Sequence, residues 1–263
     1  MSTVREIEQA LFELAPAHLA MSSDNVGHLL GDPEQEVSRV LVALDITEAV
    51  AAEAVESGCQ LIVAHHPVLN SNWERVQSIR TDDPKGHLLL QLLRSDVSAI
   101  CMHTNLDCAE GGVNDVLAQR LELMDVETVE ESQLLRAGHL EGPADLREFA
   151  AFVCSALGCN GVRFADAGRP VYRVAVGGGS CGDFEQAAIE AGCDTFVTAD
   201  LKYHQFLDAA GKGINLIDAG HFPTEDPVCE QIIAYLTDRF PELTVTKSTS
   251  HREVIQYYIE GEY

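Results

Sequence analysis

Short apolar runs rich in β-branched residues alternate with helical segments along almost the whole chain, and this alternation limits the fold more than any other feature. In the first half, the runs 38–46, 60–64 and 97–103 read as buried strands separated by helices. Thr47 is a suitable N-cap for the first of these helices, and Gly58 a suitable end. Strands that alternate with helices favour a parallel sheet with helices packed on it, so the sequence predicts an α/β fold.

The second half repeats this alternation. The stretch 124–143 is the best boundary between the two patterns, because it contains the turn signal Gly142-Pro143. A cleft between two α/β lobes would be a natural place for a binding site.

An internal similarity has two interpretations. Residues 53–66 resemble residues 186–200, and the alignment that joins Gly58 to Gly192 also places His66 on Asp200. Either any helix–glycine–strand unit would look this way, or the chain contains two related α/β lobes.

The composition excludes several classes of function. Asp and Glu number 42 against 17 Lys and Arg, so the net charge is −25, which repels nucleic acid and anionic membranes. No run of 18 apolar residues is present, and the N-terminus lacks the basic start and apolar stretch of a signal peptide. We therefore expect a cytoplasmic protein that does not enter a membrane.

Two adjacent histidines follow the apolar run 61–64 directly, and Pro67 then stops the strand. Functional groups collect at the carboxyl ends of parallel strands. Successive side chains point to opposite faces, so His65 and His66 cannot both be core residues, and each could reach a different metal ion. Surface or capping histidines are the alternative interpretation.

Two other predicted strands also end in polar residues. His103 and Asp107 follow one strand, and Asp107 supplies a hard carboxylate oxygen suited to divalent metals. His221 and Glu225 follow another, with Glu225 near a helix N-terminus that favours negative charge. Each pattern alone is also explained by helix capping. Without His103, the three strand ends supply five candidate ligands, which suits a dinuclear centre.

One further strand end carries Lys202 and His204. Lys202 is a candidate for binding an anionic substrate, and the alternative is an ordinary helix surface. His103 and His204 are candidates for moving protons, since the pKa range of histidine suits general acid–base catalysis.

At these residues the sequence resembles the Nif-three-like family of dinuclear metal proteins, whose bacterial members are named GTP cyclohydrolase I type 2 homologues. The matching segments are DNVGHLLGDP, VLVALDIT, LIVAHHPV, HTNLDCAEGGVNDVLA and the region from VTADLKYH to NLIDAGHFPTE. Three positions depart from the family pattern: Ser23, His28 and Ala199. None of them removes a predicted ligand.

The resemblance implies that two divalent metal ions per subunit are held by His65, His66, Asp107, His221 and Glu225. Zn, Fe, Mn, Co and Ni all suit such ligands. It also implies that each subunit has two interlinked α/β lobes, with mainly parallel sheets flanked by helices and the metal site in the cleft between the lobes. The subunits are implied to form a toroidal homohexamer. We assign 1–126 to the first lobe, completed by 221–263, and 127–220 to the second.

Three functions are compatible with these ligands. The first is a dinuclear hydrolase in which metal-activated water attacks a nucleotide or a similar substrate, as the cyclohydrolase name implies. The second is a metal chaperone, store or regulator without turnover. The third is a dinuclear phosphoesterase unrelated to GTP.

Overall fold

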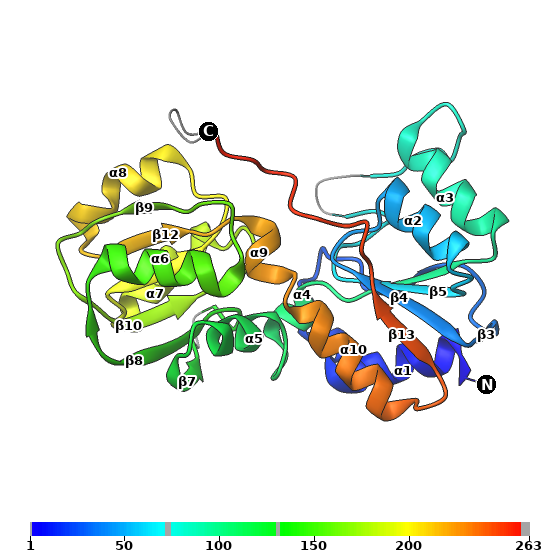
Figure 1. Ribbon diagram of the computed structural model, residues 1–263, viewed down its shortest axis with the longest axis horizontal. Coiled ribbons are helices and arrows are strands. Elements are labelled where there is room, and N and C mark those ends of the chain that lie inside the picture. Colours follow the sequence, from blue (N-terminus) through cyan, green and yellow to red (C-terminus); the bar gives the residue numbers. More distant parts are fainter. Residues whose placement is uncertain (1, 72–74, 130–131, 259–263) are drawn as a thin grey trace. The chain divides into compact units, whose positions relative to one another are not determined.

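The computed structural model describes residues 2–71, 75–129 and 132–258 (Figure 1). The chain divides into two compact units, one of Met1–Gly112 with Val228–Arg252 and one of Val113–Pro227 with Glu253–Tyr263. Each unit contains a sheet with adjacent parallel strands and helices packed on it, which confirms the predicted α/β fold class.

The sheet of the first unit consists of four adjacent parallel strands and one antiparallel edge strand. In sheet order these strands are β13 (Thr244–Lys247), β4 (Arg39–Ala43), β5 (Leu61–Ala64), β6 (Ser98–Cys101) and β2 (Gly27–Leu30). Because β13, β4, β5 and β6 run in the same direction, their carboxyl ends lie along one edge of the sheet.

Helices cover both faces of this sheet (Figure 1). The helices are α1 (Val4–Leu14), α2 (Glu48–Glu56), α3 (Pro84–Arg94) and α10 (Val228–Arg239), and the shorter elements are β1 (Ser2–Thr3), η1 (Ala17–Leu19), β3 (Glu36–Val37) and α4 (Thr104–Cys108). The helices α2 and α3 lie on one face, and α1 and α10 lie on the other. The Tyr235 hydroxyl joins the last two by donating to the Ala10 carbonyl over 2.7 Å.

Local sequence signals explain where two of these helices begin. Thr47 caps α2 by accepting a hydrogen bond from the Val50 amide, as predicted. Asp83 caps α3 by accepting one from the Gly86 amide, and Pro84 occupies the first turn, where its missing N–H costs nothing.

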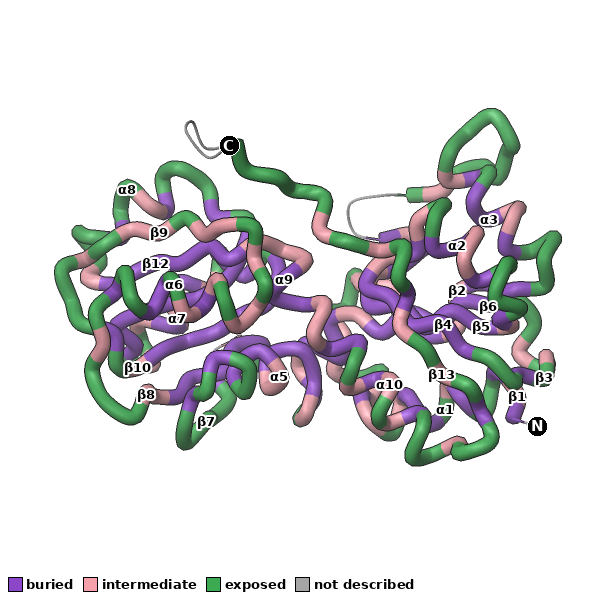
Figure 2. The backbone as a smooth tube through the Cα atoms, viewed as in Figure 1, coloured by how far each residue is buried: buried purple, intermediate pink, exposed green. Residues whose placement is uncertain are grey.

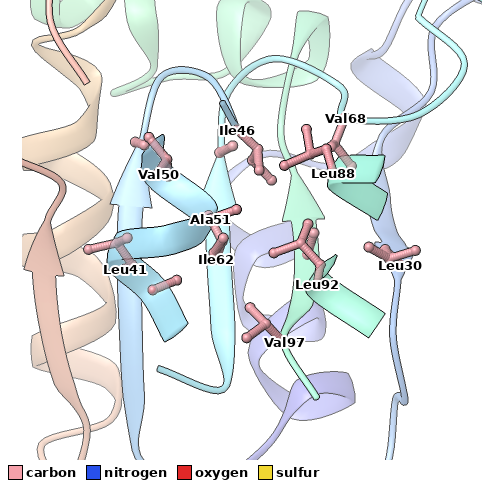
Figure 3. Close-up of a cluster of buried hydrophobic side chains, with 14 of the residues drawn as sticks. Leu30, Leu41, Ile46, Val50, Ala51, Ile62, Val68, Leu88, Leu92 and Val97 are labelled. Atoms are coloured by element: carbon pink, nitrogen blue, oxygen red, sulfur yellow. The ribbon is translucent and has the colours of Figure 1, made fainter. Parts of the chain in front are cut away.

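One apolar cluster joins α2 and α3 to the sheet (Figure 3). Leu41 and Ile62 project from the strands, Val50 from α2, and Leu88 and Leu92 from α3, and all five are at most 4% exposed. Burying each such side chain contributes about 1.5–3 kcal/mol, so this cluster stabilises the packing of α2 and α3 on the sheet.

The second unit has a six-stranded mixed sheet, in which the neighbours β10, β11 and β12 are parallel. In sheet order its strands are β7 (Met124–Thr128), β8 (Arg136–Ala144), β10 (Val171–Val176), β11 (Thr195–Thr198), β12 (Asn215–Asp218) and β9 (Arg163–Ala165). Its helices are α5 (Val113–Arg120), α6 (Leu146–Leu157), η2 (Gly182–Phe184), α7 (Glu185–Glu190), α8 (Tyr203–Lys212) and α9 (His221–Glu225). Residues of α5 and α6 belong to one buried cluster, and residues of α7 and α8 to another.

Burial along the chain follows these layers (Figure 2). The strands β5, β6, β11 and β12 are buried at every residue, whereas the edge strand β7 is exposed throughout. Among the described residues, no helix is long and apolar enough to cross a membrane.

The stretch 124–143, which we expected to form a boundary, contains β7 and most of β8 instead. Gly142-Pro143 suggested a turn, yet both residues belong to β8. The pairing of β8 with β10 shifts its register between Val171 and Arg173, opposite this dipeptide. Proline is tolerated at such an irregularity, because no ladder hydrogen bond is needed there.

The chain passes between the units after Gly112, after Pro227 and again after Arg252, so the end of the predicted segment 221–263 belongs to the second unit. The predicted positions were 126 and 220. Helix α5 belongs to the second unit because Asn114 links it to the Leu134 carbonyl and the Gly178 amide, while Asp115 pairs with Arg136.

The C-terminal segment forms no strand, although its sequence favours one. The run 253–259 has the composition of a strand, but residues 253–258 form no regular element, and Ile259 lies outside the described residues. The Ile255 carbonyl accepts a hydrogen bond from the Asn160 side chain over 2.7 Å, so this segment follows the second unit without joining its sheet.

Candidate metal centre

Polar residues follow each of three adjacent parallel strands in the first unit. Asp45 comes after β4, His65 and His66 come directly after β5, and His103 comes after β6. The sheet order β4-β5-β6 brings these groups to the same edge. The ring centroids of His65, His66 and His103 lie 4.9–5.6 Å apart.

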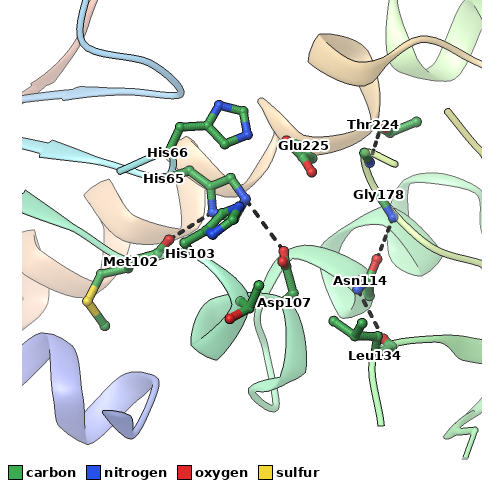
Figure 4. Close-up of polar contacts among 12 residues, drawn as sticks. His65, His66, Met102, His103, Asp107, Asn114, Leu134, Gly178, Thr224 and Glu225 are labelled. Carbon is green, nitrogen blue, oxygen red and sulfur yellow. Dashed lines mark hydrogen bonds and ion pairs between the residues drawn. The ribbon is translucent and has the colours of Figure 1, made fainter. Parts of the chain in front are cut away.

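Each of these three imidazoles is oriented through Nδ1 by an oxygen acceptor. The Nδ1 atom of His65 lies 2.8 Å from the Met102 carbonyl oxygen (Figure 4). The Nδ1 atom of His66 lies 2.7 Å from Asp45 Oδ1, and that of His103 lies 2.9 Å from each carboxylate oxygen of Asp24. A ring that donates through Nδ1–H carries its lone pair on Nε2, which is the tautomer that a metal ligand requires.

Asp45 contacts two histidines. Its second oxygen, Oδ2, lies 2.9 Å from Nε2 of His251, which follows the parallel strand β13. Burial raises the pKa of Asp45, but its contacts with His251 and His66 outweigh burial and hold it well below the usual range. The carboxylate therefore stays ionised and holds the ring of His66 in one orientation.

The turn that leads to His251 is fixed by Glu53 of α2. The Glu53 carboxylate accepts hydrogen bonds from the Ser248 hydroxyl and from the amides of Thr249 and Ser250. These bonds outweigh the effect of burial and lower the pKa of Glu53 to about 2. His251 is thereby presented to Asp45 from a well-defined turn.

Asp24, which lies just before β2, anchors His103. Its carboxylate also accepts hydrogen bonds from the Thr104 amide at 3.0 Å and the Thr104 hydroxyl at 2.6 Å. Burial opposes ionisation, but these contacts lower the pKa of Asp24 below its usual range. The sequence prediction of ligands did not include Asp24 or Asp45. The strand-end rule that found His65 applies equally to Asp45, which follows the run 39–43.

Asp107, a predicted ligand, lies on the short helix α4. Its Oδ1 atom lies 3.5 Å from Nε2 of His65 (Figure 4). The neighbouring Asn105 fixes α4 by donating to the Ala15 carbonyl over 2.7 Å. A carboxylate oxygen is thus held beside an imidazole nitrogen within the first unit.

The predicted ligands of the second unit, His221 and Glu225, lie one turn apart on α9. The Glu225 carboxylate is 3.0 Å from Nε2 of His221, whose Nδ1 is 2.7 Å from Asp200. Burial lowers the pKa of His221, but the two carboxylates outweigh burial and raise it to about 11. An imidazole between two carboxylates marks a place that stabilises positive charge, whether as a proton or as a metal ion.

Gly179 makes room for this pair. Its φ is +61°, and a Cβ atom there would lie 2.0 Å from Glu225 Oε1 and 3.1 Å from Nε2 of His221. The loop is held by the Gly179 amide, which donates to the Thr224 hydroxyl over 3.0 Å. Only glycine combines this backbone conformation with so close an approach.

Lys202 and His204, the other predicted site residues, lie at the start of α8. Both are exposed, and the Lys202 amide donates to the Gln205 side chain over 2.7 Å as the helix begins. Both residues therefore lie on the surface near a helix N-terminus. Binding of an anionic substrate by Lys202 and proton transfer by His204 stay predictions.

The donors fit a divalent metal. The first unit brings His65, His66 and His103 together as a group that could hold an ion, with one ring nitrogen of each within 4.8 Å of the others. Neutral imidazoles oriented by a carboxylate or a carbonyl are the usual ligand arrangement for zinc and similar ions. The second unit supplies His221 with its own orienting carboxylate, Asp200.

The fold and these donors define a class: α/β proteins whose parallel strands end in imidazole and carboxylate groups suited to divalent cations. The chain belongs to the Duf34/NIF3 (NGG1p interacting factor 3) family, whose model matches residues 2–253. The predicted resemblance is thereby confirmed.

Several relatives share most of this chain. A Clostridium perfringens protein named GTP cyclohydrolase 1 type 2 homolog is 33% identical over 243 residues, which cover 90% of this chain and 92% of the relative. A Streptomyces coelicolor protein of the same name is 36% identical over 250 residues, with 90% and 87% covered.

Solved structures agree on the fold. A Staphylococcus aureus hypothetical protein matches with a TM-score of 0.88 and 28% identity, over 97% of this chain and 99% of that one. A Bacillus cereus protein related to NIF3 matches with a TM-score of 0.91 over 98% and 99% of the two chains. At 22% identity, the second match shows the fold alone.

Proposed function

We propose that this protein binds two divalent metal ions through His65, His66, Asp107, His221 and Glu225, and that it is a metal-dependent hydrolase. One observation carries the proposal: His65 and His66 each have Nδ1 placed on an oxygen acceptor, which orients both rings as metal ligands. The same arrangement recurs in the second unit, where Asp200 orients His221.

Divalent ions held by such ligands lower the pKa of bound water to about 7 and so supply a nucleophile. The chain's own residues have three tasks. Asp45 and Asp200 keep the imidazole rings in position and in the correct tautomer. Lys202 is a candidate for binding an anionic group of the substrate. His103 and His204 remain candidates for moving a proton.

The substrate proposed is a nucleotide, because the relatives above are named GTP cyclohydrolase 1 type 2 homolog. Hydrolytic opening of the guanine imidazole ring would release formate. We also propose self-assembly into a homohexamer, following the resemblance, which light scattering at micromolar concentration would test. A trimer, dimer or monomer would contradict that part of the proposal.

A single screen tests the enzymatic proposal. Protein loaded separately with Zn, Mn, Fe, Co or Ni would be incubated with GTP, other nucleotides and phosphoesters, and both formate and phosphate would be measured. Formate release that is lost in Glu225→Ala supports the cyclohydrolase function. Phosphate release from phosphoesters alone indicates a dinuclear phosphoesterase instead.

Absence of turnover by metal-replete protein would contradict the hydrolase proposal. Ready exchange of metal with an acceptor chelator would then favour a metal chaperone, store or regulator. His139→Ala is the control variant and should leave metal binding and turnover unchanged. His139 on β8 pairs with Asp125 on β7, outside the strand ends that carry the predicted ligands.

A further inference from the structure

Helix α6 of the second unit ends between two cysteines. Cys154 lies in its last turn, and Cys159 follows Gly158, whose φ is +66°. The Cys159 amide donates to the Cys154 carbonyl over 2.9 Å, and the Gly158 amide donates to the Ser155 carbonyl over 3.3 Å. These two bonds form a Schellman helix ending, in which the side chains of the first and last residues of the turn commonly meet. The fold therefore places two thiols side by side.

The side chains of both cysteines have defined contacts. The Cys154 thiol donates to the Cys159 carbonyl over 3.3 Å, and the Cys159 thiol donates to the Ala219 carbonyl over 3.1 Å. Both are free, half-buried thiols. Burial, followed by the charge and the hydrogen bonding of Cys154, raises the pKa of the Cys159 thiol to about 12. The two thiols therefore interact directly, side chain to side chain.

The backbone geometry permits a disulfide between these residues. A disulfide usually joins residues whose Cα atoms are about 4.4–6.8 Å apart. The bond of 2.9 Å from Cys159 N to Cys154 O, together with standard backbone lengths, limits the separation of their Cα atoms to about 6.8 Å at most. Because the Cys154 sulfur already lies against the Cys159 carbonyl, rotation of the two side chains is enough to close the bridge.

The Cys159 thiol also contacts the loop that carries a predicted metal ligand. Ala219 follows β12 and directly precedes Gly220 and His221. Cys159, Ala219 and Gly220 line one small pocket together with Pro223, and all of these residues belong to the second unit. A chemical change at Cys159 therefore reaches the first residues of this loop within one compact unit.

We infer that Cys154 and Cys159 form a reversible dithiol–disulfide couple, which reacts with low-molecular-weight disulfides such as glutathione disulfide. Cys154 attacks first, because the raised pKa of Cys159 leaves that thiol almost entirely protonated. The Cys154 sulfur bonds to one glutathione sulfur, and the other glutathione leaves as a thiol. Cys159 then attacks the Cys154 sulfur, the protein disulfide forms and the second glutathione leaves. The two protein thiols lose two electrons and two protons, which reduce glutathione disulfide to two thiols.

The first of these steps favours the second. Once its sulfur is bonded to glutathione, Cys154 carries no charge and donates no hydrogen bond. Two of the causes that raise the pKa of Cys159 are then removed, so Cys159 becomes a better nucleophile after the first step than before it.

Oxidation would change the hydrogen bonding of the loop before His221. The disulfide replaces the hydrogen of the Cys159 thiol, so the Ala219 carbonyl loses the bond that it accepts over 3.1 Å. The redox state of the two cysteines is thereby coupled to this loop. The inference does not depend on the proposed metal binding, because neither thiol is a predicted ligand.

The first test measures how readily the disulfide forms. Full-length protein would be equilibrated without oxygen at several ratios of glutathione to glutathione disulfide, quenched with acid and alkylated. Trypsin releases the peptide 148–163, which contains Cys154 and Cys159 and no other cysteine. We expect this peptide to lose two hydrogen atoms and to take up no alkyl group. The effective concentration of the two thiols should exceed about 0.1 M, whereas flexibly linked groups reach only about millimolar values.

Hydrogen exchange would then compare the reduced and the oxidised protein. We expect the amides of 219–222 to exchange about 2- to 5-fold faster after oxidation, as for the loss of one weak hydrogen bond. Cys159→Ala removes the same thiol donor without forming a disulfide, so it should give a similar increase. Cys154→Ser keeps the Cys159 thiol and blocks the disulfide, so the oxidising buffer should leave exchange in 219–222 unchanged.

Cys59→Ser is the matched control. It removes a buried thiol of the first unit, and its peptide 148–163 should be oxidised at the same glutathione ratio as in the wild type. Thermal unfolding of each reduced variant checks that it is folded in the assay.

Two kinds of result would overturn the inference. A peptide 148–163 that carries glutathione but never forms the internal disulfide, or a millimolar effective concentration, would show that the two thiols are not a redox couple. A disulfide that forms readily but leaves exchange in 219–222 unchanged would overturn the coupling to the loop.

Discussion

The two units present different groups at the ends of equivalent strands. Strand β5 and strand β11 each follow a helix and a glycine with positive φ, Gly58 at +66° and Gly192 at +78°. Both strands have parallel neighbours on either side. Yet β5 is followed by His66, a predicted ligand, whereas β11 is followed by Asp200, a carboxylate that orients a predicted ligand.

The carboxylate–histidine pair is therefore shifted by one strand between the two units. In the first unit, the orienting carboxylate Asp45 follows β4 and the histidine follows β5. In the second, the orienting carboxylate Asp200 follows β11 and the histidine, His221, follows β12. Parallel strand ends are interchangeable positions, so what is preserved is the pairing of a carboxylate with an imidazole across adjacent strands.

The largest expected effect is on the free energy of unfolding, on removal of a carboxylate that binds two strand-end loops of the second unit. Asp218 is 3% exposed, pairs with Arg163, and accepts hydrogen bonds from the amides of Leu201 and Gly220. Asp218→Ala leaves these donors unsatisfied and should lower the free energy of unfolding by about 3 kcal/mol.

Urea denaturation followed by hydrogen exchange would measure this loss. Increased exchange should appear in β11 and β12 of the second unit and leave β4 and β5 protected. Exchange that increases equally in both units would contradict the separate roles of their carboxylates.

Gly179→Ala is expected to break the site of the second unit without touching the first. The new Cβ would lie 2.0 Å from Glu225 Oε1, so the carboxylate must move. We expect zinc affinity attributable to His221 and Glu225 to fall by about 100-fold, as for other disruptions of ligand support. Competition with a chelator would measure it.

Gly192→Ala is the matched control for this substitution. Gly192 has a similar positive φ of +78°, but no atom lies within 4 Å of its would-be Cβ. Both variants carry the same backbone cost of about 1–2 kcal/mol, so only Gly179→Ala should change metal affinity. Equal effects would attribute the change to backbone strain alone.

Asp45→Asn and Asp200→Asn test directly whether these two carboxylates have equivalent roles. An amide cannot replace the ionised oxygen that faces Nδ1, so each substitution should weaken metal binding by roughly 10- to 100-fold. Isothermal titration with zinc would give both affinities. Asp125→Asn alters a similar histidine pair, at His139, and should have no effect on zinc.

The smallest effect concerns acid stability. Because folding lowers the pKa of Glu53 from 4.5 to about 2, its contribution is complete above pH 4.5 and is lost as the pH falls toward 2. Solvent screening limits this contribution to about 1 kcal/mol. Thermal unfolding of Glu53→Gln should show a difference from wild type at pH 6 that vanishes near pH 2, and a constant difference would contradict the assignment.

The sequence predicted the fold class and most helices and strands, because the apolar periodicity of buried parallel strands is strong. It did not reveal β8, in which Gly142-Pro143 looked like a turn but occupies an irregular part of the pairing. The composition of 253–259 also favours a strand, but residues 253–258 pair with no strand and form no regular element.

The site was predictable only in part for a similar reason. Polar residues that directly follow an apolar run, such as His65 and His66, are visible in the sequence. Their orienting groups depend on the order of strands in the sheet. His251 meets Asp45 because β13 pairs with β4, and Asp24 meets His103 because β2 pairs with β6. Neither pairing leaves a local signal.

X-ray absorption spectroscopy of zinc-loaded, full-length protein tests the central claim most directly, namely that these strand ends bind divalent metal through imidazole. We predict zinc that survives gel filtration and shows imidazole scattering, with Zn–N distances of about 2.0–2.1 Å. A spectrum with oxygen neighbours alone, or protein that emerges without zinc, would contradict the account.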